Sequence, residues 1–104
     1  MVLELGAIKE AVTEVAKANG ASMAVLFGSY ARGTATKRSD VDVIFVEETD
    51  ARFLDRLGKY MNPLYDRLRT GVEVLVYTPA EFERMKERSF VRRALREGVL
   101  VYER

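Results

Sequence analysis

The chain has 104 residues, a net charge of +1 and a hydrophobic share of 48%. This length and composition predict one globular domain with one modest core. The near-neutral charge argues against strong general binding to nucleic acid. No apolar run approaches the roughly 20 residues of a membrane helix, and the first residues do not resemble a secretory signal. We therefore expect a cytoplasmic protein that does not bind a membrane.

The chain contains neither cysteine nor histidine. Disulfides, thiolate metal sites, zinc sites of the usual composition and Ser-His-Asp triads are therefore excluded. Any bound metal must be held by oxygen ligands, which favours Mg²⁺, Mn²⁺ or Ca²⁺.

The first half of the chain predicts a helix followed by two strands. Hydrophobic residues at helical spacing indicate a helix over residues 3–19. A short apolar run, 23–27, indicates a buried strand, and one or two helical turns follow over 30–32. After a polar loop, 33–39, β-branched residues predict a second strand over 41–46.

The middle of the chain predicts a helix, an interruption and a third strand. Asp50 is a suitable cap for a helix over residues 51–61. Asn62-Pro63 then interrupts this helix and starts a second, short one. The apolar run over 72–77 predicts the third strand.

The last part predicts two further helices and a closing strand. Residues 78–81 form a capping-box sequence that starts one helix, and a second helix spans 90–97. Residues 99–102 predict a fourth strand, an edge open to pairing and hence a candidate contact for a homo-oligomer. Strands interleaved with helices predict an α+β (mixed α/β) fold, a small mixed sheet covered by helices.

Three acidic residues fall at the starts of the second and third predicted strands. Asp40 and Asp42 share one face because strand residues alternate, and Glu73 belongs to the third strand. If these ends are level, each like-charge pair repels by roughly 2–2.5 kcal/mol at an effective dielectric near 20. One or two Mg²⁺ ions would convert that repulsion into binding. The alternative is an ordinary turn at Asp40 and solvated acids on a half-exposed sheet.

Gly28-Ser29 is a candidate phosphate-binding turn. It follows a buried strand, and glycine lets a phosphate approach the backbone while serine adds a hydroxyl donor. Arg32 could add positive charge there, with Lys37 and Arg38 as further candidates. The alternative is a plain turn with solvated basic residues.

The joint pattern is more specific than its parts. A strand, Gly28-Ser29, then Asp40-Val41-Asp42 on a second strand and an acid on a third resembles the DNA polymerase beta-like nucleotidyltransferase superfamily. The runs 27–35 and 39–43 look like its minimal nucleotidyltransferase (MNT) branch, as do 74–82 and 97–102. The resemblance covers nearly the whole chain and implies that fold.

The resemblance also implies a role for each candidate residue. Gly28 and Ser29, helped by Arg32, would hold the triphosphate, and Asp40 and Asp42 would ligate the metals. Glu73 would complete the cluster and help to deprotonate the attacking hydroxyl. The sequence departs from the superfamily at this position, where the acid is often Asp.

The MNT branch implies a partner. Similar proteins transfer AMP from ATP, with Mg²⁺, to a tyrosine of a HEPN-domain toxin and act as its antitoxin. Because the chain resembles the catalytic module alone, we expect the acceptor to come from such a second protein. The alternative is a non-catalytic nucleotide-binding antitoxin that neutralises its partner by masking it, which Glu73 keeps open. Transfer to a small molecule is a third, less favoured hypothesis.

Overall fold

A four-stranded mixed sheet forms the centre of the protein. The computed structural model describes residues 2–104. Its strands are β1 (Met23–Phe27), β2 (Val41–Val46), β3 (Val72–Tyr77) and β4 (Val99–Glu103), and they lie in the order β3-β2-β1-β4. β1 is antiparallel to β2 and β4, whereas β2 and β3 are parallel. The predicted α+β architecture is confirmed, and β4 is an edge strand of this sheet.

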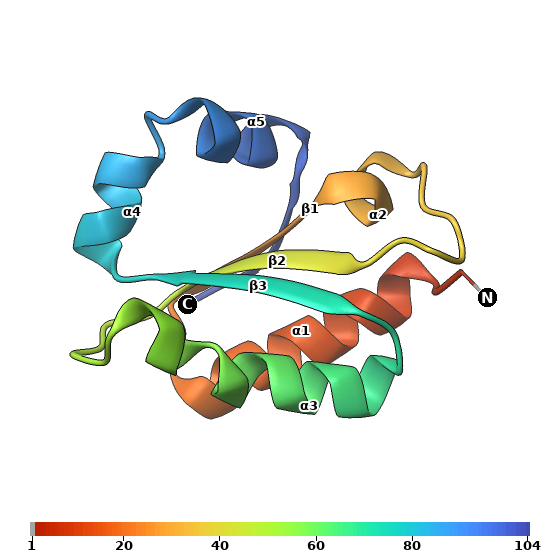
Figure 1. Ribbon diagram of the computed structural model, residues 1–104, viewed down its shortest axis with the longest axis horizontal. Coiled ribbons are helices and arrows are strands. Elements are labelled where there is room, and N and C mark those ends of the chain that lie inside the picture. Colours follow the sequence, from red (N-terminus) through yellow and green to blue (C-terminus); the bar gives the residue numbers. More distant parts are fainter. Residues whose placement is uncertain (1) are drawn as a thin grey trace.

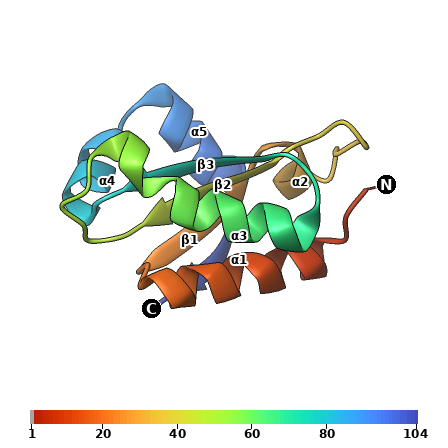
Figure 2. The ribbon, with the colours of Figure 1, turned by 60° about the horizontal axis from the view of Figure 1, so that its bottom comes forward.

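Helices cover both faces of the sheet. Two long helices, α1 (Leu5–Asn19) and α3 (Gly58–Leu68), lie side by side under one face (Figures 1 and 2). The shorter α4 (Pro79–Met85) and α5 (Ser89–Glu97) stand over the other face. The single-turn helix α2 (Gly28–Arg32) follows directly from the end of β1. No helix within residues 2–104 is long and apolar enough to cross a membrane.

Strand alternation distributes the apolar side chains between two cores. Val43 and Phe45 of β2 are fully buried with α1 and α3, where Tyr60 stacks on Phe45 at 4.1 Å between ring centroids. Ile44 points the other way, into a smaller cluster with Val91 of α5. Asp42 therefore shares the α5 side of the sheet with Ile44, because residues two apart along a strand face the same way.

The predicted helix over residues 51–61 is wrong. A short 3-10 helix, η1 (Phe53–Arg56), precedes α3 instead, and Leu54 is 75% exposed rather than inward-facing. The buried side chain of Arg56 explains the difference. Its guanidinium donates to the carbonyl of Ala51 at 2.9 Å, an acceptor that a helix starting at Ala51 would use for its own backbone. It also donates to Glu81 at 2.6 Å.

The predicted break at Asn62-Pro63 is also wrong, because α3 runs through Pro63 without interruption. Proline has no backbone N–H, so it leaves the carbonyl four residues earlier, that of Lys59, without its helical partner. Asn19 at the end of α1 donates its side-chain amide to that carbonyl at 2.9 Å. A contact between two helices thus replaces the bond that proline removes.

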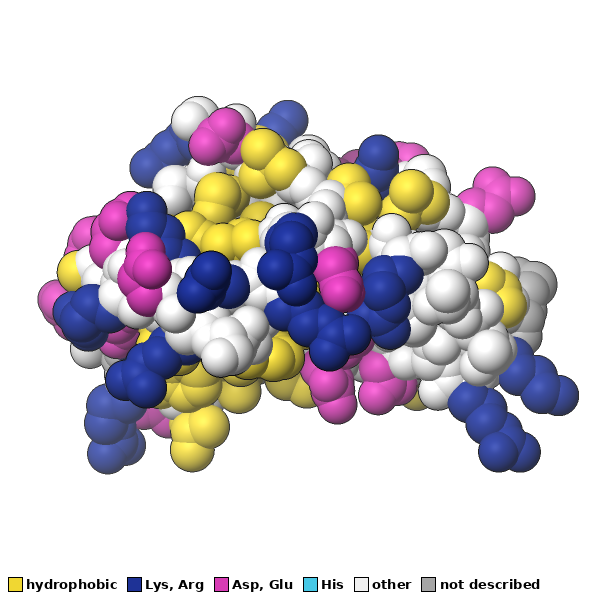
Figure 3. Space-filling model, turned by 90° about the horizontal axis from the view of Figure 1, so that it is seen from above, with side chains coloured by type: hydrophobic (Ala, Val, Ile, Leu, Met, Phe, Trp, Pro, Cys, Tyr) yellow, Lys and Arg dark blue, Asp and Glu magenta, His cyan; other side chains and the backbone are white. Residues whose placement is uncertain are grey.

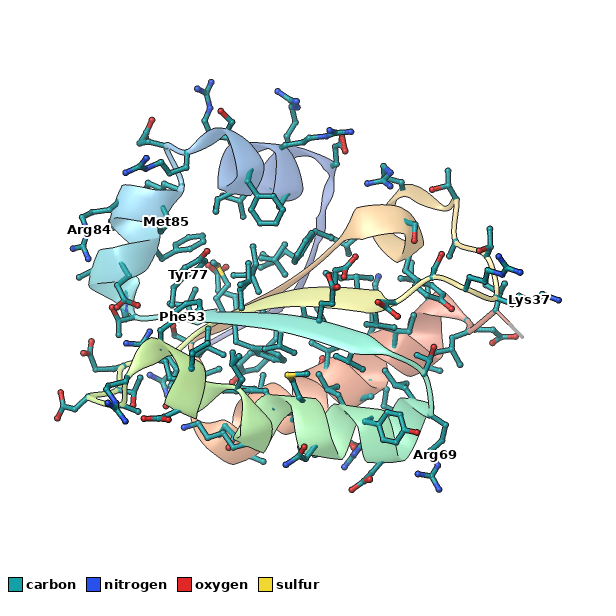
Figure 4. All side chains as sticks on the ribbon, in the orientation of Figure 1. Lys37, Phe53, Arg69, Tyr77, Arg84 and Met85 are labelled. Carbon is teal, nitrogen blue, oxygen red and sulfur yellow. The ribbon has the colours of Figure 1, made fainter. Side chains whose placement is uncertain are left out.

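The predicted helix start at residues 78–81 is confirmed. The hydroxyl of Thr78 accepts from the Glu81 backbone at 3.2 Å, and the Glu81 carboxylate accepts from the Thr78 backbone at 2.9 Å. Figure 4 shows Tyr77 and Met85 pointing into the space between β3 and α4, whereas Arg84 points outward. α4 is thereby anchored over the end of β3.

Candidate functional site

The register of the two parallel strands brings Asp42 and Glu73 level. Asp42 pairs with Glu73 across β2 and β3, and with Phe27 across β2 and β1. Phe27 is the last residue of β1, so the turn at Gly28 follows beside Asp42. The structure therefore brings the acidic ends of two strands and the predicted phosphate-binding turn to one end of the sheet.

Gly28 and Asp42 are in close contact. Gly28 has φ of +75°, a conformation that residues with a side chain rarely adopt. A Cβ at this position would overlap the Asp42 carboxylate. Glycine is thus required at this position for two reasons: the turn into α2 needs its positive φ, and a side chain would collide with the Asp42 carboxylate.

The Asp42 side chain is half-buried, and its hydrogen-bonding capacity is not fully used. Among residues 2–104, its Oδ1 is the one buried side-chain polar atom without a hydrogen-bond partner. Burial raises the pKa of Asp42 to about 7, helped by hydrogen bonding with and repulsion from Glu73 and by repulsion from Asp40, while Arg32 opposes the shift. A buried polar atom without a partner is costly, and native structures leave few of them. An orphaned carboxylate oxygen beside a second carboxylate fits a divalent cation, which prefers oxygen ligands.

Asp40 stands apart from this pair. It precedes β2 and lies against Gly71, where a Cβ would overlap its carboxylate. Within residues 2–104, no three acidic side chains are gathered into a group that could hold a metal ion by themselves. The close pair is Asp42 and Glu73, and Mg²⁺ sites commonly use one or two carboxylates together with substrate phosphates.

A cavity of about 780 Å³ opens beside the acidic pair, on the side of the sheet covered by α5. Of the predicted site residues, Gly28, Arg32, Asp42 and Glu73 line it, whereas Ser29 and Asp40 do not. The rest of the wall comes from the sheet and from α5, and it is mainly apolar: Phe27, Val74, Leu75, Tyr77, Phe90 and Ala94. The volume falls within the usual range for small-molecule sites.

Two of the candidate basic residues lie elsewhere. Lys37 projects from the loop before β2 into solvent, away from the cavity (Figure 4), and neither it nor Arg38 lines the cavity. Only Arg32 of the three is positioned to act on the acidic pair, and its charge lowers the pKa of Asp42 against the other influences.

The mouth of the cavity carries a second arginine that sequence analysis missed. Arg93 and Glu97 of α5 both line the cavity, and Arg93 Nε donates to Glu97 Oε1 at 3.0 Å. Glu97 Oε2 lies 3.8 Å from Arg32 Nη1, which ties α5 to α2. Figure 3 looks onto the side of the molecule that carries α4 and α5, where dark blue and magenta side chains gather beside a yellow, apolar area.

The sequence does hold a signal for these α5 residues. Phe90, Arg93, Ala94 and Glu97 recur at intervals of three and four residues, which places them on one face of a helix. That face mixes an aromatic ring, a cation and an acid instead of the aliphatic residues of a core. Such a face indicates a cavity wall, but only the fold reveals that α5 stands opposite Asp42.

Comparison with known proteins identifies the family. Residues 8–101 match the sequence family described as nucleotidyltransferase domain. A Methanocaldococcus jannaschii protein named as a protein adenylyltransferase is 35% identical over 81 residues, which is 75% of this chain and 75% of that protein.

Solved structures share the fold. A crystal structure assigned as a nucleotidyltransferase from Sulfolobus solfataricus has a TM-score of 0.60 and 29% identity, and the match covers 96% of this chain and 80% of that one. A toxin–antitoxin structure with AMP-PNP has a TM-score of 0.69 at 18% identity, covering 92% and 73%. A variant of the toxin–antitoxin pair MntA-HpeT has a TM-score of 0.68 at 16% identity, with the same coverage. With its family match spanning most of the sequence, the chain belongs to the nucleotidyltransferase domain family and is a nucleotidyltransferase.

Proposed function

We propose that the chain is a Mg²⁺-dependent protein adenylyltransferase that transfers AMP from ATP to a tyrosine hydroxyl of a HEPN-domain toxin and so acts as its antitoxin. One observation carries the catalytic part of this proposal. The buried Oδ1 of Asp42 has no hydrogen-bond partner among residues 2–104 and belongs to a carboxylate packed on Gly28 and level with Glu73, in the wall of a ligand-sized cavity.

Asp42 and Glu73 are the residues that would hold the metal. Asp40 lies outside this pair and contributes negative charge, which helps to raise the pKa of Asp42. When bound, Mg²⁺ supplies positive charge that offsets both the carboxylates and the phosphates. Gly28 lines the same cavity, where phosphate oxygens would meet backbone that carries no side chain. Arg32 adds a cation on the cavity wall.

The reaction needs a base and a positioned acceptor. The acceptor oxygen bonds to the α-phosphorus, the bond from that phosphorus to the pyrophosphate oxygen breaks, and pyrophosphate leaves. The hydroxyl proton passes to a carboxylate, and Glu73 is our candidate because it is an exposed acid beside Asp42 in a chain without histidine. The apolar part of the cavity wall, which includes Phe90 of α5 and Leu75 of β3, suits an aromatic ring.

Support for a toxin partner comes from the relatives. The M. jannaschii protein is named for adenylyl transfer to protein, and the two toxin–antitoxin structures share the fold. A second candidate is an antitoxin that neutralises its partner by binding alone. The absence of a ready three-acid metal group within residues 2–104 favours this candidate.

One experiment separates the two functions. The wild type, Asp42→Asn and Asp66→Asn are incubated with ATP labelled at the α-phosphate, Mg²⁺ and a HEPN-domain partner, and toxin activity is measured in parallel. Asp66 is a matched control, because it is an exposed acid on α3, under the opposite face of the sheet. Adenylyl transfer predicts label on the partner with wild type and Asp66→Asn, and none with Asp42→Asn. Neutralisation without label, or label transfer that survives Asp42→Asn, would refute the catalytic proposal.

A further inference from the structure

Two arginines from different helices share one carboxylate at the cavity mouth. Arg93 Nε lies 3.0 and 3.4 Å from the two oxygens of Glu97 on the same helix. Arg32 Nη1, from α2, lies 3.8 Å from Glu97 Oε2. All three side chains line the cavity, which leaves one positive charge in excess at its mouth.

Glu97 is held by contacts that a bound anion could readily take over. Its side chain is 27% exposed, and those of Arg32 and Arg93 are 43% and 68% exposed. Exposed ion pairs of this kind stabilise a protein very little, so breaking them costs little. A guanidinium makes two parallel hydrogen bonds to a phosphate as readily as to a carboxylate. Phosphate oxygens could therefore take the place of Glu97 at little cost in stability.

The position of the two arginines in the cavity indicates which phosphates of the nucleotide they would bind. In the proposed reaction the α-phosphate must lie beside Asp42 and Glu73, where the acceptor is activated. The arginines stand at the α2–α5 side of the same cavity, and Arg32 is close enough to influence Asp42 electrostatically. The β- and γ-phosphates would extend away from the acidic pair, and their negative charge would then face the two arginines.

We propose that Arg32 and Arg93 together bind the β- and γ-phosphates of the nucleotide, and that Glu97 is the internal anion that holds both arginines at the cavity mouth until the phosphates replace it. This inference rests on the proposed function and adds a residue from α5 to the nucleotide site. Arg93 is a binding residue in this scheme, and Glu97 is a positioning residue that competes with the ligand.

The test is isothermal titration of Mg²⁺ with AMP-PNP, and separately with AMP, into the wild type and four variants. These are Arg93→Gln, Arg93→Lys, Glu97→Gln and the control Arg92→Gln. Arg92 is the adjacent exposed arginine of α5 and does not line the cavity. A thermal melt of each variant establishes that it is folded.

We expect Arg93→Gln to weaken AMP-PNP binding by about tenfold, because charged hydrogen bonds to phosphate are lost, and to leave AMP binding nearly unchanged. Arg93→Lys should recover part of the lost affinity, because lysine keeps the positive charge but cannot make the paired hydrogen bonds of a guanidinium. Glu97→Gln should tighten AMP-PNP binding by roughly threefold, because a competing negative charge is removed. A purely structural role for Glu97 predicts the opposite, a weakening of both ligands.

Equal losses for AMP-PNP and AMP, no change in Arg93→Gln, or the same loss in Arg92→Gln would overturn the inference while the proposed function stands. If the folded wild type binds no nucleotide, the proposed function itself fails, and this inference fails with it.

Discussion

The carboxylate of Asp42 packs against Gly28 so closely that any side chain on that glycine would overlap it. The contact joins the end of β1 to the start of β2 and thereby couples the turn to the acid. It places the Gly28 turn and the Asp42 end of β2 side by side although a loop separates them in the sequence.

Gly28→Ala tests this coupling, and Gly33→Ala is its matched control. Both glycines have positive φ, +75° and +77°, but a Cβ on Gly33 meets nothing within 4 Å. We expect Gly33→Ala to lower the free energy of unfolding by about 1 kcal/mol, the cost of the conformation alone. Gly28→Ala should cost roughly 1–3 kcal/mol more, because the added methyl overlaps Asp42. Urea denaturation measures both, and equal losses would show that the contact is unimportant.

The Asn19–Lys59 contact predicts a specific double-mutant result. Asn19→Ala removes the donor to the carbonyl that Pro63 leaves free, which should cost about 0.5–1.5 kcal/mol of unfolding free energy. In a Pro63→Ala background, residue 63 regains an N–H that can bond that carbonyl within α3. The cost of Asn19→Ala should therefore fall by at least half in that background. Purely additive losses in the four-variant cycle would contradict this account.

The ion pair between Glu81 and Arg56 predicts a pH dependence of stability. Hydrogen bonding from the Arg56 guanidinium and from the Thr78 backbone lowers the pKa of Glu81 from 4.5 to about 2. Because the folded-state pKa lies below the unfolded one, the stabilisation is present above pH 4.5 and is lost as pH falls toward 2. At about 1.4 kcal/mol for each pKa unit, the difference between 4.5 and about 2 corresponds to about 3.5 kcal/mol. Because the Glu81 side chain is 30% exposed and solvent screens the pair, we expect a smaller loss of roughly 2–3 kcal/mol.

The measurement is urea denaturation of wild type and Glu81→Gln at pH values from 2 to 6. Glu81→Gln should be less stable than wild type at pH 6, and the two curves should approach each other at the acidic end. Parallel curves across this window would mean that Glu81 does not titrate as the Arg56 contact requires.

Local patterns predicted much of the fold. β1, β2 and β3 have the predicted bounds, because each is a short apolar run ended by a turn or a change in polarity. The Thr78 capping box is also purely local. The helix over residues 51–61 was wrong because the side chain of Arg56 takes the Ala51 carbonyl. The break at Asn62-Pro63 was wrong because the side chain of Asn19 supplies a donor to the Lys59 carbonyl. Such partners cannot be inferred from local propensity.

The candidate site could also be predicted in part from local sequence patterns. The facing of Asp42 and Glu73 follows from strand alternation and level pairing, and the structure has that register. The place of Asp40 against Gly71 depends on the course of the loop before β2, and the contribution of Arg93 and Glu97 depends on how α5 lies over the sheet. The spacing of the α5 residues indicates that they share a helix face, but it does not indicate which part of the sheet that face covers.

The most direct test of the central claim is calorimetric titration of AMP-PNP into wild type and Asp42→Asn, each with and without Mg²⁺. Our account predicts binding to the wild type only when Mg²⁺ is present, and a loss of about 10-fold or more in Asp42→Asn, because a charged metal ligand is removed. Binding of equal strength without Mg²⁺, or unchanged binding in Asp42→Asn, would contradict the claim that this carboxylate holds a metal-bound nucleotide.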